Sequence, residues 1–84
     1  MSKDAIESKL KEIFHALFNL SPEQITADTS PDNVKRWDSL QHLTLVPSIE
    51  EEFRISISEQ DIVDMLSFGL AVEIVSSALQ KSRG

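Results

Sequence analysis

Apolar side chains recur at intervals of three and four residues in three segments of this chain, and this spacing most constrains its fold. Residues spaced in this way share one face of an α-helix, so each segment predicts an amphipathic helix with one buried stripe. The spacing predicts helices over about residues 4–20, 38–53 and 68–80. The stripes expected to be buried are Ile6, Leu10, Ile13, Phe14 and Leu17 in the first helix, Leu40, Leu43, Val46, Ile49 and Phe53 in the second, and Phe68, Ala71, Val72, Val75, Ala78 and Leu79 in the third.

Side chains that can cap a helix stand at the start of each predicted helix. Such a side chain accepts from the free N–H groups of the first turn, and an acid or amide three residues later can return the bond. One further pair of this kind predicts a short helix over residues 59–66. The candidate caps are Asp4 with Glu7, Asp38 with Gln41, Ser58 with Asp61, and Ser67.

Residues 21–37 separate the first two predicted helices and show no sustained periodicity. Turn-forming residues are frequent here, which predicts a long loop. Ser21 followed by Pro22 favours one helical turn at its start. Ile25 and Val34 are the apolar residues that we expect to anchor the loop to the core.

Two features depart from the helical pattern. Pro47 is inside the second predicted helix, where it lacks an N–H and clashes with the preceding turn, so we expect a kink or a break into two shorter helices. Residues 54–57 alternate like a strand but have no partner segment. We expect an extended connector that buries Ile55 and Ile57.

Together these segments predict an all-α fold. Three longer helices, one short helix and a long loop between the first two make a small four-helix bundle. The 84 residues have room for a single domain, residues 1–84, and we expect a monomer.

Composition excludes several classes of site. The chain has no cysteine, which rules out disulfides, thiolate metal sites and a cysteine nucleophile. Its net charge of −6 argues against nucleic-acid binding, which needs clustered Lys and Arg. No segment approaches the roughly 20 apolar residues of a membrane span, and no signal-peptide pattern opens the chain, so we expect a cytoplasmic protein without membrane insertion. His15 and His42 have no carboxylates at metal-ligand spacing, so we expect surface histidines and no metal site.

Negative charge is concentrated in the middle of the chain. Residues 38–64 contain seven acids and one base, Arg54, for a net charge of −6. Such a surface steers basic partners, or it serves only as a solubilising face.

The segment Trp37-Asp38-Ser39-Leu40 lies where the loop meets the second predicted helix. Downstream of it, the apolar run from Leu43 to Ile57 includes the cluster Glu50-Glu51-Glu52-Phe53, and upstream stands Ile25-Thr26-Ala27-Asp28-Thr29-Ser30. In order and spacing this series resembles the acyl carrier protein family, in its stand-alone form, over nearly the whole chain. Asp-Ser-Leu alone would be a weak signal.

The resemblance implies that Ser39 bears a 4′-phosphopantetheine arm, which a separate phosphopantetheinyl transferase attaches from coenzyme A. The arm's thiol would carry acyl groups as thioesters between loading, transfer and synthase enzymes of a fatty-acid, polyketide or other specialised pathway. The chain itself would not be an enzyme, and it would have no catalytic residue. Asp38 would be recognised by the modifying enzyme, while partner enzymes would contact Leu40, Gln41, Thr44, Glu50, Glu51 and Glu52.

Some residues depart from the family pattern. Gln41 and Thr44 stand where many fatty-acid carriers have acids, so we expect docking there to be less electrostatic. Trp37 replaces a residue that is often small; it would shield the base of the arm, staple the helix start, or pack against the loop.

Two alternatives remain open at this point. An aminoacyl or peptidyl carrier is a near neighbour, although such domains usually show Gly-Gly-x-Ser, whereas Arg36-Trp37-Asp38-Ser39 stands here. The other alternative is a helical interaction module that is never modified.

Overall fold

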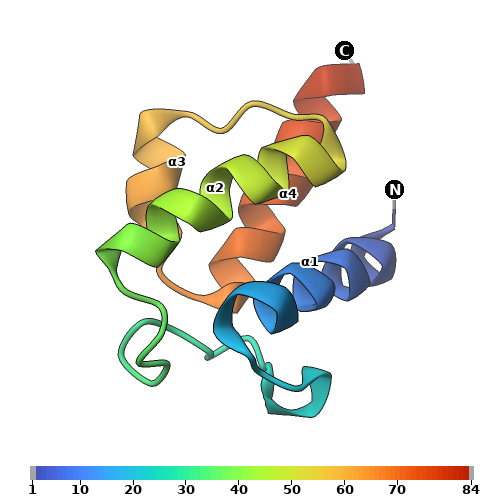
Figure 1. Cartoon of the computed structure of the whole chain (residues 1–84). Helices are drawn as coiled ribbons and strands as arrows, with labels where there is room; N and C mark the ends of the chain where they lie inside the picture. Colours follow the sequence, from blue (N-terminus) through green and yellow to red (C-terminus); the bar gives the residue numbers. More distant parts are fainter. Residues whose placement is uncertain (1, 84) are drawn as a thin grey trace.

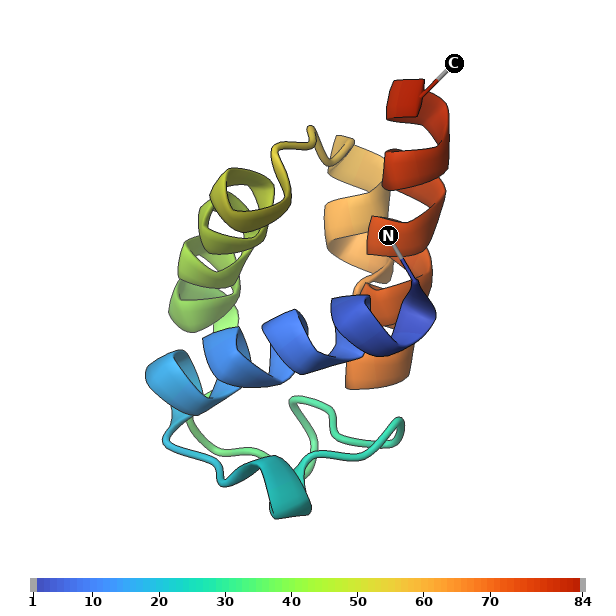
Figure 2. The same ribbon diagram turned by 90° about the vertical axis from the view of Figure 1, so that its right-hand side faces the viewer.

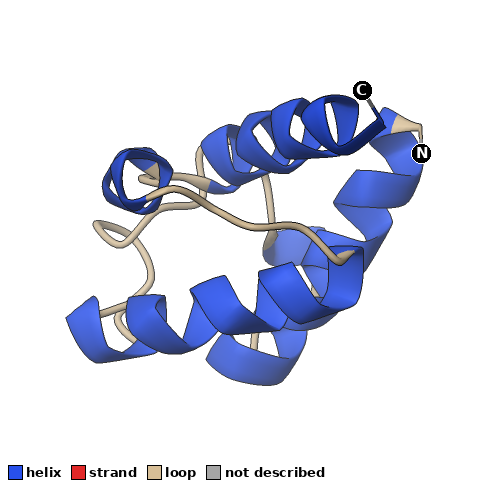
Figure 3. Cartoon of the chain, turned by 90° about the horizontal axis from the view of Figure 1, so that it is seen from above, coloured by secondary structure: helices blue, strands red, loops and turns tan. Residues whose placement is uncertain are grey.

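The computed structural model describes the backbone of residues 2–83 and the side chains of residues 2–81. It confirms the predicted four-helix bundle, with three long helices, one short helix and a long connection between the first two (Figure 1). No strand occurs within residues 2–83 (Figure 3). The elements are α1 (Lys3–Phe18), the 3₁₀ turn η1 (Pro22–Gln24), α2 (Ser39–Phe53), α3 (Glu59–Asp64) and α4 (Phe68–Arg83).

Helix α1 crosses the bundle from α2 to α4 and packs against both (Figure 2). The core is apolar and continuous through the bundle. Phe18 and Leu45 belong to it, although the predicted stripes did not include them, while Ile13 and Leu17 are only partly buried against it. Other buried members are Ile6, Leu10, Phe14, Trp37, Val46, Ile49, Phe53, Met65, Phe68, Ala71, Val72 and Val75.

The loop between α1 and α2 runs beneath α1 and is held to the bundle at several points (Figure 2). Ile25 and Val34 are buried, as predicted, and η1 follows Ser21. The loop also contacts the start of α4, because the N–H of Phe68 donates to the carbonyl of Thr29 at 2.7 Å. The loop therefore places the start of α2 relative to α4.

The start of α1 differs from the prediction. The N-cap is Ser2, whose Oγ accepts from the N–H of Ala5 at 3.2 Å, so the Asp4–Glu7 capping box was wrong. Asp4 is instead in the first turn, where the positive end of the helix dipole stabilises its negative charge. The helix ends at Phe18, two residues before the predicted end, because Asn19 adopts a left-handed conformation with φ of 57°.

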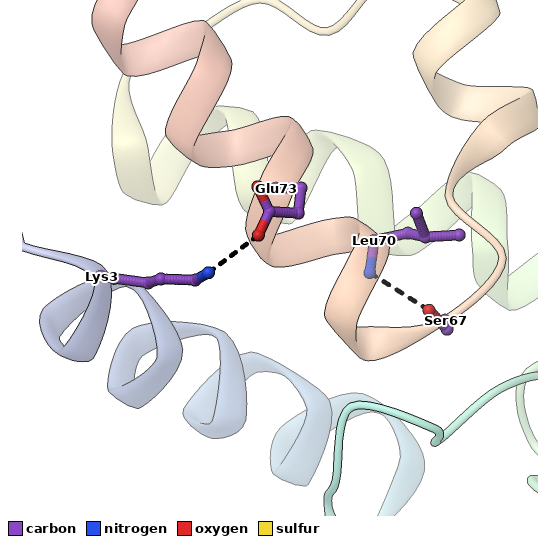
Figure 4. A network of polar contacts seen from close by, with 4 residues as sticks. All are labelled: Lys3, Ser67, Leu70 and Glu73. Atoms are coloured by element: carbon purple, nitrogen blue, oxygen red, sulfur yellow. Dashed lines mark hydrogen bonds and ion pairs between the residues drawn. The ribbon is translucent and has the colours of Figure 1, made fainter.

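Asp38, Ser58 and Ser67 cap their helices, as predicted, but within the described residues no return bond from the side chain of Gln41 or Asp61 completes a capping box. Asp38 Oδ1 and Ser58 Oγ accept from N–H groups three residues later, at 2.9 and 3.1 Å. Ser67 Oγ accepts from the N–H of Leu70 at 3.1 Å (Figure 4). Figure 4 also shows the exposed ion pair that joins α1 to α4, in which Lys3 Nζ lies 2.8 Å from Glu73.

Two helix ends fall elsewhere than predicted. Helix α3 ends at Asp64 rather than at residue 66, and its predicted last residue, Leu66, is exposed. Helix α4 continues to Arg83, three residues beyond its predicted end at residue 80, and Gly84 lies outside the described residues. Ile55 and Ile57 are buried in an extended connector, as predicted.

Helix α2 is continuous through Pro47, so the predicted break was wrong. Pro47 is exposed. The carbonyl that loses its partner therefore faces the side where water can donate to it, which lowers the cost of the missing bond. A kink at this position stays a prediction.

The buried face of α2 is rotated from the predicted stripe. Val46, Ile49 and Phe53 are buried as expected, but Leu40 and Leu43 are 72% and 65% exposed. The inward positions in the first half of the helix are taken by half-buried His42 and fully buried Leu45. These share a face with Val46 and Ile49 at intervals of three and four residues.

Candidate functional site

Ser39 is the first residue of α2, and it is exposed. Asp38 precedes it in an extended conformation and caps the helix, and the N–H of His42 donates to the Asp38 carbonyl at 2.8 Å. The amides of Ser39 and Leu40 therefore come before the first intrahelical bond. The Ser39 hydroxyl lies at the helix end where N–H groups and the dipole favour an anion.

Ser39 lies on the rim of a groove of about 500 Å³ between the start of α2 and α3. Helix α2 forms one wall, and α3 with the residues after it forms the other. Most of the lining residues are apolar, and Asp38 contributes a carboxylate. The lining residues are Pro31, Trp37, Asp38, Ser39, His42, Leu43, Ile62, Val63 and Leu66.

Large apolar side chains are exposed around this groove. Leu40 and Leu43 come from α2, while Val63 and Leu66 come from α3 and the residues after it; they are 72, 65, 65 and 59% exposed. We call these four residues the apolar face. Exposed apolar groups gathered in one place are typical of an interaction site. Of the four, the family resemblance named Leu40 as a partner contact, whereas helical spacing assigned both Leu40 and Leu43 to the buried stripe.

Trp37 packs inside the bundle. It is 2% exposed, its ring stacks on Phe18 at 5.5 Å, and it meets Phe14 edge-on at 5.1 Å. Its Nε1–H donates to Nδ1 of His42 at 2.9 Å. Nε2 of His42 lies 2.8 Å from the carbonyl oxygen of Ile62 in α3. His42 was predicted as a surface histidine, and that was wrong: it is half-buried and bonded on both sides.

The acidic cluster at the end of α2 is partly engaged within the molecule. Glu50 Oε2 accepts from the N–H of Ile57 at 2.8 Å, which fixes the connector after α2. Glu52 forms an exposed ion pair with Lys9 of α1 at 2.9 Å. The hydrogen bond and attraction of Glu52 raise the pKa of Lys9 above its ordinary value. Glu51 is exposed, and no ion pair involves it within the described part of the chain.

The remaining predicted contacts lie early on α2. Gln41 is half-buried, and its N–H is taken by the Asp38 cap. Thr44 is exposed and its hydroxyl donates to the carbonyl of Leu40 at 3.3 Å. Residues 2–83 contain no group of three His, Asp or Glu placed to hold a metal ion. None of the described helices is long and apolar enough to cross a membrane.

No protein-family model matches the chain. Curated relatives nevertheless match most of its length. It is 35% identical to an acyl carrier protein from Cyanidium caldarium, over 89% of this chain and 87% of the relative. It is 32% identical to an acyl carrier protein from Kineococcus radiotolerans, over 92% of this chain and 95% of the relative.

Solved structures give the same result. The fold matches the solution structure of a holo acyl carrier protein from Geobacter metallireducens with a TM-score of 0.81 and 25% identity, over 92% of this chain and 88% of that one. The helical fold indicates the same family as the sequence relatives, which align over nearly their full length. The chain belongs to the acyl carrier protein family.

Proposed function

We propose that this protein carries acyl groups as thioesters on a 4′-phosphopantetheine arm attached to Ser39. One observation carries the proposal: in Trp37-Asp38-Ser39-Leu40, the serine is the exposed first residue of α2, on the rim of an apolar groove. Its hydroxyl is open to a modifying enzyme. The thiol that forms the thioester would come from the arm, since the chain has no cysteine.

The residues around Ser39 fit a phosphodiester. The amides of Ser39 and Leu40 precede the helical ladder, and the positive end of the α2 dipole stabilises a negative charge beside them. The apolar groove that begins at Ser39 fits the aliphatic part of an arm. Asp38 holds the first turn through its bond to the Gln41 N–H, and so fixes the direction in which Ser39 projects.

The protein's own part is to present and orient the cargo, while other proteins supply the catalysis. We propose that a phosphopantetheinyl transferase recognises Asp38 and Ser39, and that loading and synthase enzymes dock on α2. The proposed contacts are Leu40, Gln41 and Thr44 near the arm and Glu50, Glu51 and Glu52 at the far end. Of these acids, Glu51 is the most available, because Glu50 and Glu52 already bind Ile57 and Lys9.

The test is modification of the purified protein. We expect incubation with coenzyme A and a broad-specificity phosphopantetheinyl transferase to add the mass of one phosphopantetheinyl group. Ser39→Ala should gain nothing. Ser48→Ala is the matched control, because Ser48 is also on α2 but its hydroxyl donates to the Thr44 carbonyl at 3.1 Å. If the wild type gains no mass, or if Ser39→Ala still gains it, the attachment site is elsewhere or does not exist.

A further inference from the structure

Helix α3 is the less firmly held wall of the groove beside Ser39. It has six residues, and none of them is fully buried. The buried anchors lie outside the helix, at Ile57 before it and Met65 after it. A six-residue helix is not stable by itself, so contacts from the rest of the molecule must hold it in place.

His42 supplies such a contact across the groove. A tryptophan Nε1–H can only donate, so Nδ1 of His42 accepts from Trp37 and the ring proton is on Nε2. Nε2–H then donates to the carbonyl of Ile62. That carbonyl is in the last turn of α3, where it accepts a long bond from the N–H of Met65 at 3.4 Å and has a second lone pair for His42. His42 of α2 therefore caps the end of α3 from a neighbouring helix.

The other end of this chain of bonds is rigid. Trp37 packs against both Phe14 and Phe18 of α1, and its ring lies nearly parallel to that of His42, with centroids 6.1 Å apart. A buried aromatic cluster thus fixes the indole, the indole fixes the imidazole, and the imidazole fixes α3. Hydrogen bonds linked in series in a partly buried site support one another.

We propose that His42 is a positioning residue that holds α3 against the start of α2, so that the two halves of the apolar face form a single docking surface beside Ser39. Leu40 and Leu43 belong to one half, and Val63 and Leu66 to the other. The partner is the enzyme that modifies Ser39, so this part of the inference rests on the proposed function. We call the hydrogen bonds from Trp37 through His42 to Ile62 the bridge. Without the bridge, α3 moves independently and the partner contacts only half of the surface.

The bridge itself is tested by amide hydrogen exchange on the unmodified protein. His42→Phe keeps a ring in place but removes both hydrogen bonds. We expect exchange of the amides of Ile62 in α3 and of Met65 just after it to quicken by about tenfold, as expected for loss of hydrogen bonds of ordinary strength. Amides of α1 and α4 should keep their protection, which also shows that the variant is folded.

Two further variants sharpen this result. Trp37→Phe keeps an aromatic ring against Phe14 but removes the donor, so it should quicken exchange in α3 in the same way. The double variant should be no worse than the more severe single one, because the bonds act in series. His15→Phe is the matched control: His15 is exposed on α1 and bonds to Leu20, so α3 exchange should not change. Unchanged α3 exchange in His42→Phe overturns the bridge.

The docking role is tested by the kinetics of modification. We expect His42→Phe to raise the transferase KM for the carrier several-fold with little change in kcat, since Ser39 and its cap remain in place. The control His15→Phe should keep the wild-type KM. Faster amide exchange in α3 together with an unchanged KM would overturn the docking role. If the wild type is not modified at all, the proposed function fails, and the exchange experiment still decides the bridge.

Discussion

Glu50 has a structural role within the fold, in addition to its proposed role in docking. Its carboxylate accepts from the N–H of Ile57 at 2.8 Å, at the point where the connector turns toward α3. Ile57 is buried, so without the carboxylate this N–H would lose its partner in a partly buried site. The neighbouring Glu51 is exposed and has no such role.

We therefore expect Glu50→Ala to lower the free energy of unfolding by about 1.5 kcal/mol, the usual cost of removing a charged acceptor from a buried N–H. Glu50→Gln should restore most of the loss, because an amide oxygen also accepts. Glu51→Ala is the matched control and should change stability by less than about 0.5 kcal/mol. Urea unfolding measures all three. Equal stability of the two alanine variants would contradict the role assigned to Glu50.

At the scale of single helices, α2 shows how a proline is accommodated. Pro47 is exposed, and α2 continues through it to Phe53. The missing bond still costs stability, even where water replaces the partner.

We expect Pro47→Ala to raise the free energy of unfolding by about 1–2 kcal/mol, because it restores one helical bond and removes a clash with the preceding turn. Thermal or urea unfolding measures the gain. Ser48→Ala, at the next position, should change stability by less than about 0.5 kcal/mol. A loss of stability in Pro47→Ala would mean that the surrounding fold needs the shape that the proline imposes.

The sequence was sufficient to predict which segments are helical, since apolar spacing and caps such as Asp38, Ser58 and Ser67 are local signals. It could not fix where the buried face of α2 is centred. Leu43 fits the helical spacing as well as Leu45 does, and only the position of α1 and α4 decides between them. The contact of His42 with Ile62 joins residues 20 positions apart in the sequence, so no local pattern predicts it.

At the scale of the whole molecule, the region around the candidate site combines an apolar face with a negative charge. Residues 38–64 carry a net charge of −6, while Leu40, Leu43, Val63 and Leu66 are exposed beside Ser39. Ser39 itself was proposed from the sequence, because its neighbours resemble the series of residues typical of the family. The apolar face was not, because two of its members come from α3 and the residues after it, which only the fold brings beside α2.

We expect the KM of the modifying enzyme for the carrier to rise several-fold between low and physiological salt, because screening weakens attraction between exposed charges. Glu51→Gln should raise the KM more than Glu52→Gln does, since Glu52 already pairs with Lys9 at 2.9 Å. A KM that does not respond to ionic strength would show that the acidic cluster is only a solubilising face.

The proposed function requires that an acyl group is carried as a thioester on an arm at Ser39. In the most direct experiment, the protein is incubated with acetyl-coenzyme A and the transferase. Its intact mass is then recorded before and after treatment with neutral hydroxylamine. Because the chain has no cysteine, a hydroxylamine-sensitive acyl group can only be on the arm's thiol. We predict the mass of one acetylated arm, falling to that of the free arm after treatment, and no gain in Ser39→Ala. An unmodified wild-type protein, or an acetyl group that survives hydroxylamine, would contradict the account.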